Sequence, residues 1–374
     1  MQQAIPGKYG KKLRILVAPL DWGLGHVTRC IPIIKELLQN DCDVLLAGNE
    51  IQRSLLNAEF PNLPFLLLPG YRVNYSKLRA VWRWKMLLQL PKIFSAARAE
   101  NKWLKEMIAE HQFDAVISDS RVGLWNKSIP CVFITHQLKM KTFTGRWTER
   151  MLQRLNYKFI SRFSECWVPD VEGEKNLAGE LSHPEKKPKI PVHYIGAISR
   201  FENAVSNFAA KKDHLLVVLS GPEPQRTILE NMIIDEIANY PATATISRGL
   251  PGAANIIPST GMIRFFNHLP AKEMEVEIKK AEWIISRSGY STVMDLLKMK
   301  KKSILIATPG QTEQEYLSDH LMRNQLAFCT QQKKFSLYLA LNEASLFKYQ
   351  LSSFDRPKEM KQVIENFLNR LNKQ

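Results

Sequence analysis

Short apolar runs alternate along the chain with longer segments in which apolar residues recur at helical spacing. Residues 13–19 (LRILVAP) form the first run. Residues 27–39 follow, with apolar positions at 30, 31, 34, 37 and 38 that are typical of an amphipathic helix. Further apolar runs predict short strands at 44–47, 65–68, 115–118, 131–135, 167–169 and 194–195. Strands that alternate with helices predict a parallel, doubly wound α/β sheet.

The same alternation begins again after residue 213. Apolar runs predict strands at 215–219, 243–246, 263–266, 283–286 and 304–307, and helical spacing predicts helices at 228–238 and in a last segment that reaches about residue 371. Residues 196–213 are polar and lack a period, so we place a linker there. The sequence therefore predicts two tandem Rossmann-like domains, residues 1–200 and 201–355.

Composition and charge narrow the class of protein. Hydrophobic residues make up 45% of the 374 residues and charged residues 24%, as in ordinary folded domains. The net charge is +16, and residues 1–200 carry 30 Lys and Arg against 18 Asp and Glu. A basic first half indicates an anionic partner surface, phospholipid or nucleic acid, with solubility alone as the alternative.

Cysteine usage and hydropathy bear on the compartment. The five cysteines, at 30, 42, 131, 166 and 329, form no CxxC pair, which favours reduced thiols and a cytoplasmic protein. No apolar run approaches the 18 or more residues of a membrane span, and residues 13–20 are too short for a signal peptide.

The first candidate site follows the first predicted strand. Ligands of parallel sheets bind at the carboxyl ends of the strands. Gly23 and Gly25 allow close backbone approach there, and His26 opens the next helix, where an imidazole can act as a base near neutral pH. Asp21 and Asp119 are reserve candidates for the base. The alternative for His26 is a structural or capping histidine.

Two further motifs follow strands of the second half. In SRSGYST (286–292) the free N–H groups of a helix start and the hydroxyls of Ser288 and Thr292 suit a phosphate, and Asp295 suits ribose hydroxyls. In TPGQTEQE (308–315), Gln311, Gln314 and Glu315 suit sugar hydroxyls. Ordinary helix capping and a solvated loop are the alternatives. We expect no metal site, because the eight histidines show no ligand spacing.

Two segments combine cations with aromatic residues. Residues 72–105 hold nine Lys or Arg and one acid, and residues 139–162 hold seven and one. This combination suits an anionic membrane interface, although single-stranded nucleic acid or a solvated helix face are alternatives. We expect membrane contact from five residues of the first segment: Arg79, Trp82, Arg83, Trp84 and Lys85.

These motifs, in this order, resemble the GT-B glycosyltransferases, specifically family 28 and its MurG-like relatives. SRSGYSTVMDL (286–296) resembles the family's donor element, TPGQTEQE its sugar-contact loop, RFFNHLPAKEME (264–275) its uracil segment, and GLGH (23–26) its glycine turn. The resemblance implies two Rossmann-like domains that face each other across a cleft. The first binds the acceptor and is completed by helix 356–374, and the second binds the nucleotide sugar.

The resemblance also assigns residues to roles. It implies that His26 faces the donor phosphates and the acceptor hydroxyl, and that Gly23, His136 and Gln137 bind the acceptor. Two departures stand out: Pro222 and Pro224 remove N–H donors from the second glycine turn, where Arg226 would compensate with its charge, and His136–Lys139 lacks the usual carboxylate. The donor-binding residues it implies are Gly25, Ser220, Gly221, Arg226, Phe265, Phe266, Arg287, Ser288, Gly289, Ser291, Thr292, Asp295, Gln311, Gln314 and Glu315.

The sequence thus predicts an inverting, metal-independent glycosyltransferase that moves a sugar from a UDP-sugar to a lipid-linked or other membrane-associated acceptor. We expect no cofactor beyond the nucleotide sugar, no nucleic-acid partner, and a place at the inner face of the cytoplasmic membrane in the synthesis of envelope glycans or glycolipids. A nucleotide-sugar epimerase or hydrolase on the same fold is one alternative. A non-catalytic protein that binds nucleotide sugars or nucleic acid is the other.

Overall fold

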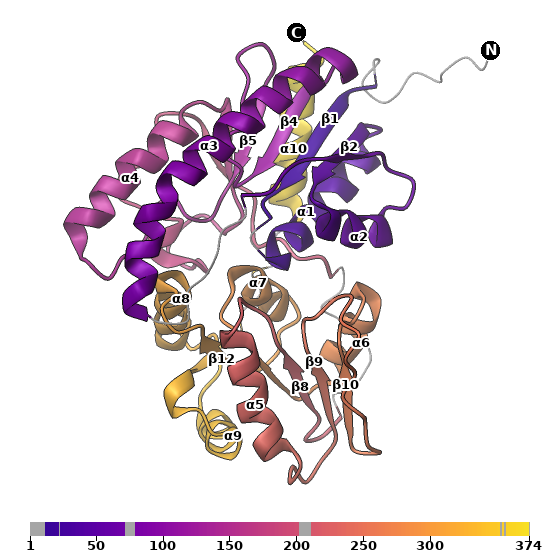
Figure 1. Cartoon of the computed structure of the whole chain (residues 1–374), viewed down its shortest axis with the longest axis vertical. Coiled ribbons are helices and arrows are strands. Elements are labelled where there is room, and N and C mark those ends of the chain that lie inside the picture. Colours follow the sequence, from indigo (N-terminus) through magenta and orange to yellow (C-terminus); the bar gives the residue numbers. More distant parts are fainter. Residues whose placement is uncertain are drawn as a thin grey trace. The chain divides into compact units, whose positions relative to one another are not determined.

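The computed structural model describes residues 12–21, 23–71, 79–201, 211–351, 354 and 357–373, without the side chains of residues 24, 79–91, 93 and 357. They fall into two compact units, each with its own sheet (Figure 1). Unit 1 contains the described parts of residues 1–74, 84–198 and 355–374, and unit 2 contains those of residues 75–83 and 199–354.

Unit 1 is built on a seven-stranded sheet in the order β3-β2-β1-β4-β5-β6-β7, and all its strand pairs are parallel. The strands are β1 (Arg14–Pro19), β2 (Asp43–Gly48), β3 (Phe65–Leu67), β4 (Ala115–Asp119), β5 (Cys131–Ile134), β6 (Glu165–Val168) and β7 (Val192–Tyr194). Pro19 pairs with Asp119, and Asp119 with Ile134, so the carboxyl ends of β1, β4 and β5 share one edge.

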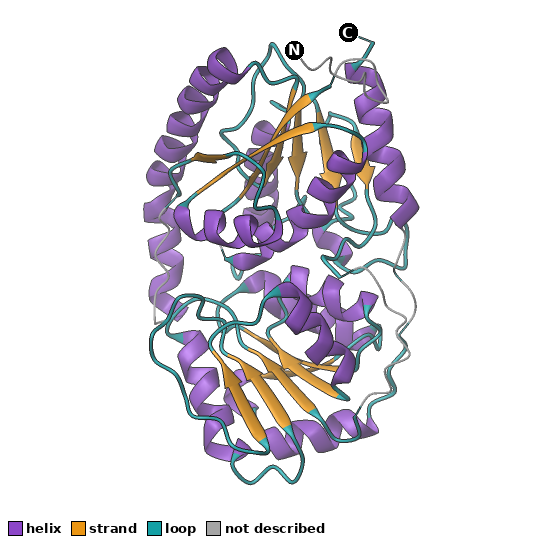
Figure 2. Cartoon of the chain, turned by 90° about the vertical axis from the view of Figure 1, so that its right-hand side faces the viewer, coloured by secondary structure: helices purple, strands orange, loops and turns teal. Residues whose placement is uncertain are grey.

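Helices cover both faces of this sheet (Figure 2). They are α1 (Leu24–Gln39), α2 (Glu50–Glu59), α3 (Arg79–His111), α4 (Arg146–Ile160), the 3-10 turn η1 (Gly179–Leu181) and α10 (Pro357–Leu371). The last helix returns to unit 1, where the ring of Phe367 packs edge-on against Trp167 and Arg370 pairs with Glu165.

Unit 2 repeats the architecture with a six-stranded parallel sheet in the order β10-β9-β8-β11-β12-β13. Its strands are β8 (Leu215–Val218), β9 (Ala244–Ser247), β10 (Ile263–Phe266), β11 (Trp283–Ser286), β12 (Ser303–Ala307) and β13 (Phe328–Gln331). Its helices are α5 (Gln225–Ile237), α6 (Ala271–Lys280), α7 (Tyr290–Lys298), α8 (Thr312–Arg323), η2 (Gln332–Lys334) and α9 (Leu337–Leu346).

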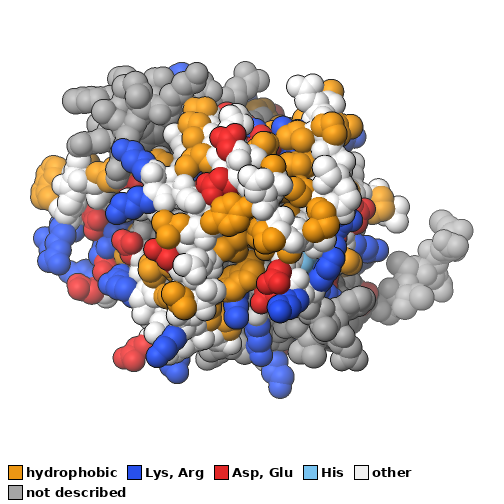
Figure 3. Space-filling model, turned by 90° about the horizontal axis from the view of Figure 1, so that it is seen from below, with side chains coloured by type: hydrophobic (Ala, Val, Ile, Leu, Met, Phe, Trp, Pro, Cys, Tyr) orange, Lys and Arg blue, Asp and Glu red, His pale blue; other side chains and the backbone are white. Residues whose placement is uncertain are grey.

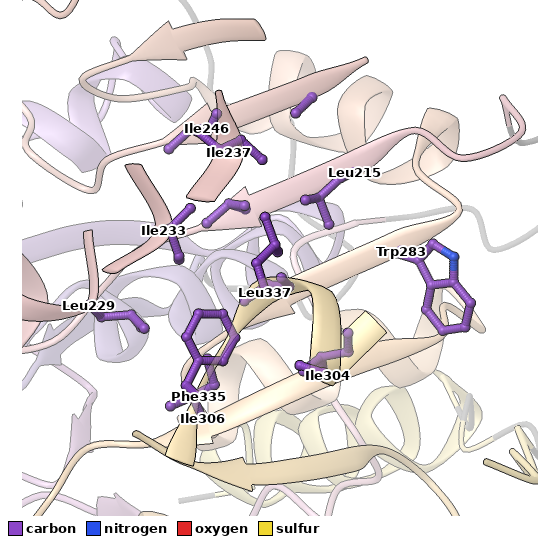
Figure 4. Packing of buried hydrophobic residues seen from close by; sticks show 14 of the residues in the cluster. Leu215, Leu229, Ile233, Ile237, Ile246, Trp283, Ile304, Ile306, Phe335 and Leu337 are labelled. Carbon is purple, nitrogen blue, oxygen red and sulfur yellow. The ribbon is translucent and has the colours of Figure 1, made fainter. Parts of the chain in front are cut away.

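The core of unit 2 is aliphatic along the strands and aromatic at its margins. On the end of unit 2 seen in Figure 3, hydrophobic side chains gather in the middle, with acidic and basic side chains interspersed around them. In the interior, Leu215, Ile304 and Ile306 are fully buried and pack with Ile233 of α5 and Leu337 of α9 (Figure 4). Such strands are apolar on both faces because helices cover both sides of a parallel sheet.

The predicted fold class is confirmed: two parallel sheets, each flanked by helices, follow one another in the chain. Each apolar run that predicted a strand is a strand, with ends that differ by at most two residues. The prediction missed β13, because Phe328–Gln331 contains Cys, Thr and Gln and offers no apolar run. The chain passes from unit 1 to unit 2 between Ile198 and Ser199, inside the segment 196–213.

Candidate active site

A buried cluster at the carboxyl edge of the unit 1 sheet joins α1 to β4. His26 lies in the first turn of α1, and its Nδ1 is 3.1 Å from Oδ2 of Asp119, the last residue of β4. Arg29 donates from Nε to the same oxygen at 2.7 Å and from a terminal nitrogen to Oδ1. Asp119 is fully buried, whereas 19% of the His26 side chain is exposed, so the imidazole has the access that a base needs.

The second candidate acceptor residue joins this cluster. His136 lies two residues after the end of β5, and its Nδ1 is 3.2 Å from a terminal nitrogen of Arg29. Gln137 is fixed beside it, because its N–H donates to Thr135 Oγ1 at 3.0 Å and its carbonyl accepts from Asn156 at 2.9 Å. The structure therefore brings together three residues that the sequence singled out separately: His26, Asp119 and His136.

Arg29 is the residue that the sequence analysis missed. It stands three positions after His26 in the same helix, and this spacing places both side chains on one face. That spacing was the available signal, but an arginine in an amphipathic helix is usually solvated, whereas Arg29 is only 3% exposed.

Burial and charge set the protonation of the cluster. Burial and then the Arg29 cation lower the pKa of His26, and the Asp119 carboxylate opposes them only in part. Burial alone would raise the pKa of Asp119, but Arg29 and His26 hold it well below its usual range. At neutral pH the site therefore combines an ionised Asp119 with a neutral His26.

The tautomer of His26 decides what this imidazole can do. Its Nδ1 lies near two groups, Oδ2 of Asp119 at 3.1 Å and a terminal nitrogen of Arg29 at 2.8 Å, and can satisfy only one of them at a time. When Nδ1–H donates to Asp119, Nε2 carries the lone pair and can accept a proton from a substrate hydroxyl.

Asp21, a reserve candidate for the base, is engaged elsewhere. Its Oδ2 accepts from the backbone N–H of Tyr71 at 3.0 Å, and its Oδ1 lies 4.0 Å from a terminal nitrogen of Arg121. A Cβ on Gly70 would come within 2.1 Å of Oδ2, so Gly70 is required for this contact. Asp21 thus fastens the turn before Gly23, whose φ of 84° starts α1.

A buried ion pair that the sequence analysis did not identify supports this turn. Arg121 is fully buried; it donates from Nε to the Pro19 carbonyl at 2.7 Å and from a terminal nitrogen to Glu100 Oε1 at 2.6 Å. The hydroxyl of Tyr71 donates to the other oxygen of Glu100. Burial raises the pKa of Glu100, and Arg121 opposes this shift. The pair ties the ends of β1 and β4 to α3, next to the histidine cluster.

At the carboxyl edge of the unit 2 sheet, α6 starts after Pro270 without a side-chain cap, and in α5 the Thr227 N–H donates to Glu223 Oε2 at 3.3 Å. The N-cap residues of α5, α7 and α8 are Pro224, Gly289 and Gln311, and none of them caps its helix through its side chain. They follow β8, β11 and β12, which are neighbours in the sheet. By contrast, α2 has a full capping box between Asn49 and Gln52. First-turn N–H groups that no side chain caps are suited to bind an anion.

The glycine turn before α5 holds its arginine tightly. Gly221 has a φ of 101°, and a Cβ there would lie 3.6 Å from Thr308 Oγ1, so Ser220 and Gly221 lie beside the loop after β12. Arg226 is 5% exposed and donates to Glu223 at 2.6 Å and to Glu230 at 3.0 Å. We expected the charge of Arg226 to compensate for the missing N–H donors. In the structure this charge is already balanced by the carboxylates of Glu223 and Glu230.

The SRSGYST segment folds as a strand, a turn and a helix. Ser288 is buried and donates to the Gln314 carbonyl at 3.0 Å, and Gly289 precedes the half-buried Ser291 and Thr292 in the first turn of α7. Arg287 is buried and contacts only backbone oxygens among the described residues. The turn therefore presents backbone and hydroxyl groups rather than the guanidinium.

Asp295 already has partners within unit 2. Its Oδ1 accepts from the Ser199 hydroxyl, and its Oδ2 lies 3.6 Å from Arg200 Nε. Burial raises the pKa of Asp295, and Arg200 opposes this shift. A ribose hydroxyl would have to share the carboxylate with Ser199 or replace it.

The remaining donor candidates lie on the loop after β12, at the end of β10 and, for Gly25, in the first turn of α1. Gln314 accepts from the Thr308 N–H at 2.9 Å and donates to Gln311 Oε1 at 2.6 Å, and Glu315 accepts from the Gly310 N–H at 3.1 Å. These bonds shape the loop before any ligand binds. Phe265 and Phe266 end β10 and are half-buried. Gly25 lies in the first turn of α1, where its carbonyl accepts from Thr28 Oγ1 at 3.0 Å.

The basic and aromatic segments are largely helical. The side chains of the expected membrane residues Arg79, Trp82, Arg83, Trp84 and Lys85 lie outside what the structure describes. On α4 and the turn before it, Trp147 is 74% exposed, Met151 48% and Phe143 37%. Arg146, Arg150 and Arg154 are exposed on the same segment. Within the described residues, no helix is long and apolar enough to cross a membrane, and no group of three or more His, Cys, Asp or Glu could hold a metal ion.

Comparison with known proteins agrees with the fold and the motifs. Residues 264–371 match the family model of the glycosyltransferase family 28 C-terminal domain. A protein of Methanosarcina acetivorans described as an uncharacterized glycosyltransferase is 22% identical over 326 residues, which cover 81% of this chain and 82% of that protein.

Two solved structures share the architecture over nearly the whole chain. The glycosyltransferase SnogD from Streptomyces nogalater has a TM-score of 0.61 at 14% identity, covering 96% of this chain and 100% of that one. MurG of Acinetobacter baumannii has a TM-score of 0.52 at 15% identity, covering 97% and 100%. These two likenesses show the fold, and with the family model and the relative they confirm the resemblance drawn from the sequence.

Proposed function

Because the chain is a glycosyltransferase of the GT-B fold with a family 28 C-terminal domain, we propose that it transfers a sugar from a UDP-sugar to a lipid-linked or other membrane-associated acceptor. The reaction inverts the anomeric centre and requires no metal. The observation that carries this proposal is the cluster of His26, Asp119 and Arg29, which presents a neutral imidazole at the carboxyl edge of the unit 1 sheet.

His26 is the proposed general base. Its Nε2 accepts the proton of the acceptor hydroxyl while the hydroxyl oxygen forms a bond to the anomeric carbon, and the bond from that carbon to the nucleoside diphosphate breaks. Attack from the face opposite the leaving group inverts the centre. Asp119 holds the ring through Nδ1 and stabilises the imidazolium that forms, because it is buried and ionised.

The diphosphate leaves with negative charge, which must be met by groups of the protein. The first turns of α7 and α8, whose N-cap residues make no side-chain hydrogen bond, can turn N–H groups toward it, and Ser288, Ser291 and Thr292 add hydroxyls. These groups can stabilise the departing charge in the way that a divalent cation does in other enzymes.

The other donor contacts follow from position. Phe265 and Phe266 border the base, Asp295 binds the ribose by sharing its carboxylate with Ser199, and the sugar hydroxyls meet Gln311, Gln314 and Glu315. His136 and Gln137 lie beside Arg29 and receive the acceptor together with Gly23.

We further propose that α4 contributes to binding at the inner face of the cytoplasmic membrane. The exposed Trp147 and Met151 of α4, with Phe143 of the turn before it, suit the interface of a bilayer, and the neighbouring arginines suit anionic lipid headgroups. The end of unit 2 in Figure 3 also carries exposed hydrophobic side chains, but acidic and basic groups alternate around them, which favours anionic lipid less.

A thermal-shift panel of nucleotide sugars tests the donor class. We expect UDP-sugars to raise the melting temperature, and lipid extracts incubated with the stabilising donor to yield a glycosylated lipid detectable by mass spectrometry. Conversion of the donor without any acceptor would instead indicate an epimerase or hydrolase. The proposal would be contradicted if no nucleotide sugar raised the melting temperature.

A further inference from the structure

Arg287 is a buried cation that has no carboxylate partner within the part of the chain that the structure describes. It is 1% exposed, and its terminal nitrogens donate to the carbonyls of Gln225 at 2.6 Å, Ala307 at 3.3 Å and Ile306 at 3.4 Å. No Asp or Glu of the described residues pairs with it, and its Nε is buried without a hydrogen-bond partner in the structure.

The other deeply buried arginines of the described chain are balanced. Arg29 pairs with Asp119, Arg121 with Glu100, and Arg226 with Glu230. Burying a charge without an opposite charge costs folding free energy. A buried, unpaired cation therefore indicates either a functional role or a bound ligand that supplies the opposite charge. Burial lowers the pKa of Arg287 to about 10, which still leaves the guanidinium charged near neutral pH.

The position of this charge indicates what would balance it. Arg287 directly follows β11 and contacts the end of β12 and the first residue of α5. The helix α7 starts three residues further on. The cation therefore lies between the start of α5 and the end of β12, three residues before α7 begins. Directly after β12, Thr308 Oγ1 is also buried without a hydrogen-bond partner among the described residues.

We propose that Arg287 is a positioning residue whose buried charge draws the donor diphosphate onto the loops after β8, β11 and β12, without touching it. The guanidinium clamps these loops through backbone carbonyls, and its unbalanced charge adds to the positive potential of the helix N-termini. This inference rests on the proposed function, because it takes the anion to be the nucleoside diphosphate.

The test compares ligands of increasing charge on the same protein. Uridine, UMP and UDP share the nucleoside, so a charge effect must grow along the series, whereas a distorted loop affects all three. In Arg287→Gln we expect UDP to bind about tenfold more weakly, UMP by a smaller factor, and uridine within about twofold of wild type by isothermal titration calorimetry. Arg287→Lys retains the charge and should retain the preference for UDP over uridine.

Lys301 offers a matched control in the same unit. Its ammonium also donates to backbone carbonyls, those of Lys279 and Ala281, but it lies before β12, at the opposite edge of the sheet. Lys301→Gln removes the same charge and should leave the affinity for UDP unchanged.

Equal weakening of uridine and UDP in Arg287→Gln, or a loss of UDP preference in Arg287→Lys as large as in the glutamine variant, would overturn the inference. If Arg287→Gln does not fold, the lysine variant alone decides between charge and clamping, since its single nitrogen cannot make all three carbonyl contacts. Wild-type protein that binds none of the three ligands would refute the proposed function, and this inference with it.

Discussion

The pair of Arg29 and Asp119 allows a quantitative test of the active-site cluster. Both side chains are buried, 2% and 0% exposed, and Arg29 Nε lies 2.7 Å from Asp119 Oδ2. Arg29→Met leaves the carboxylate without its cation, and Asp119→Asn leaves the guanidinium without its anion. Removing one partner of a buried pair costs about 3–5 kcal/mol. At about 2–4 °C per kcal/mol, unit 1 should melt roughly 6–20 °C lower.

Differential scanning calorimetry of the two single variants and the double variant gives the coupling. We expect the double variant to lose less stability than the sum of the single losses, since it leaves no buried charge unpaired. The exposed pair of Lys102 and Glu106, at 3.9 Å, is the control, and Lys102→Ala should change stability by less than about 1 kcal/mol. Single losses below about 1 kcal/mol, or strictly additive losses, would refute the reasoning.

The dependence on pH has a definite sign. Because Arg29 holds the pKa of Asp119 below its usual range, the pair stabilises the fold at neutral pH, and this contribution is lost as the pH falls through the lowered pKa. In Arg29→Met, burial without the cation raises the pKa of Asp119, so the difference in stability between wild type and the variant should shrink gradually as the pH falls from that raised pKa to the lowered pKa of wild type. A difference that already vanishes between pH 5 and 7 contradicts the assignment.

Three further predictions concern the site and its surroundings. Since burial and Arg29 lower the pKa of His26, the acid limb of the transfer rate should have its midpoint below the usual histidine pKa of about 6.5. A midpoint above that value would show that Asp119 has the larger effect on this pKa. Trp147→Ser with Arg150→Gln should weaken sedimentation with anionic vesicles by about 1 kcal/mol or more, whereas neutralising the exposed Lys212 and Lys300 of unit 2 should not. Neutralising Arg79, Arg83 and Lys85 should reduce vesicle binding as well. Unchanged binding would mean that these three residues form a solvated helix face without a role at the membrane.

The fold was accessible from the sequence because a parallel sheet leaves a strong local signal. Strands such as Ala115–Asp119 are buried along their whole length, so each appears as a short apolar run between helical segments. The edge strand Phe328–Gln331 is the exception: three of its four residues are partly or fully exposed, and it escaped prediction.

The site was accessible only in part. His26, Asp119 and His136 were found because each follows a strand, and register in a parallel sheet brings such positions to one edge. The two buried ion pairs beside them were not predicted. Arg29 and Asp119 are 90 positions apart, and Arg121 and Glu100 are 21 apart, so no local sequence pattern indicates either pair. The balance of Arg226 by Glu230, and the lack of a carboxylate partner for Arg287 among the described residues, likewise follow only from the tertiary structure.

We propose His26 as the base of sugar transfer, with no part in holding the donor. The most direct measurement compares His26→Ala with wild type for both quantities, transfer from a UDP-sugar to a lipid acceptor and the dissociation constant for UDP. We predict that transfer falls by a factor on the order of 10²–10⁴ while the affinity for UDP stays within about twofold. Unchanged turnover in His26→Ala would contradict the account.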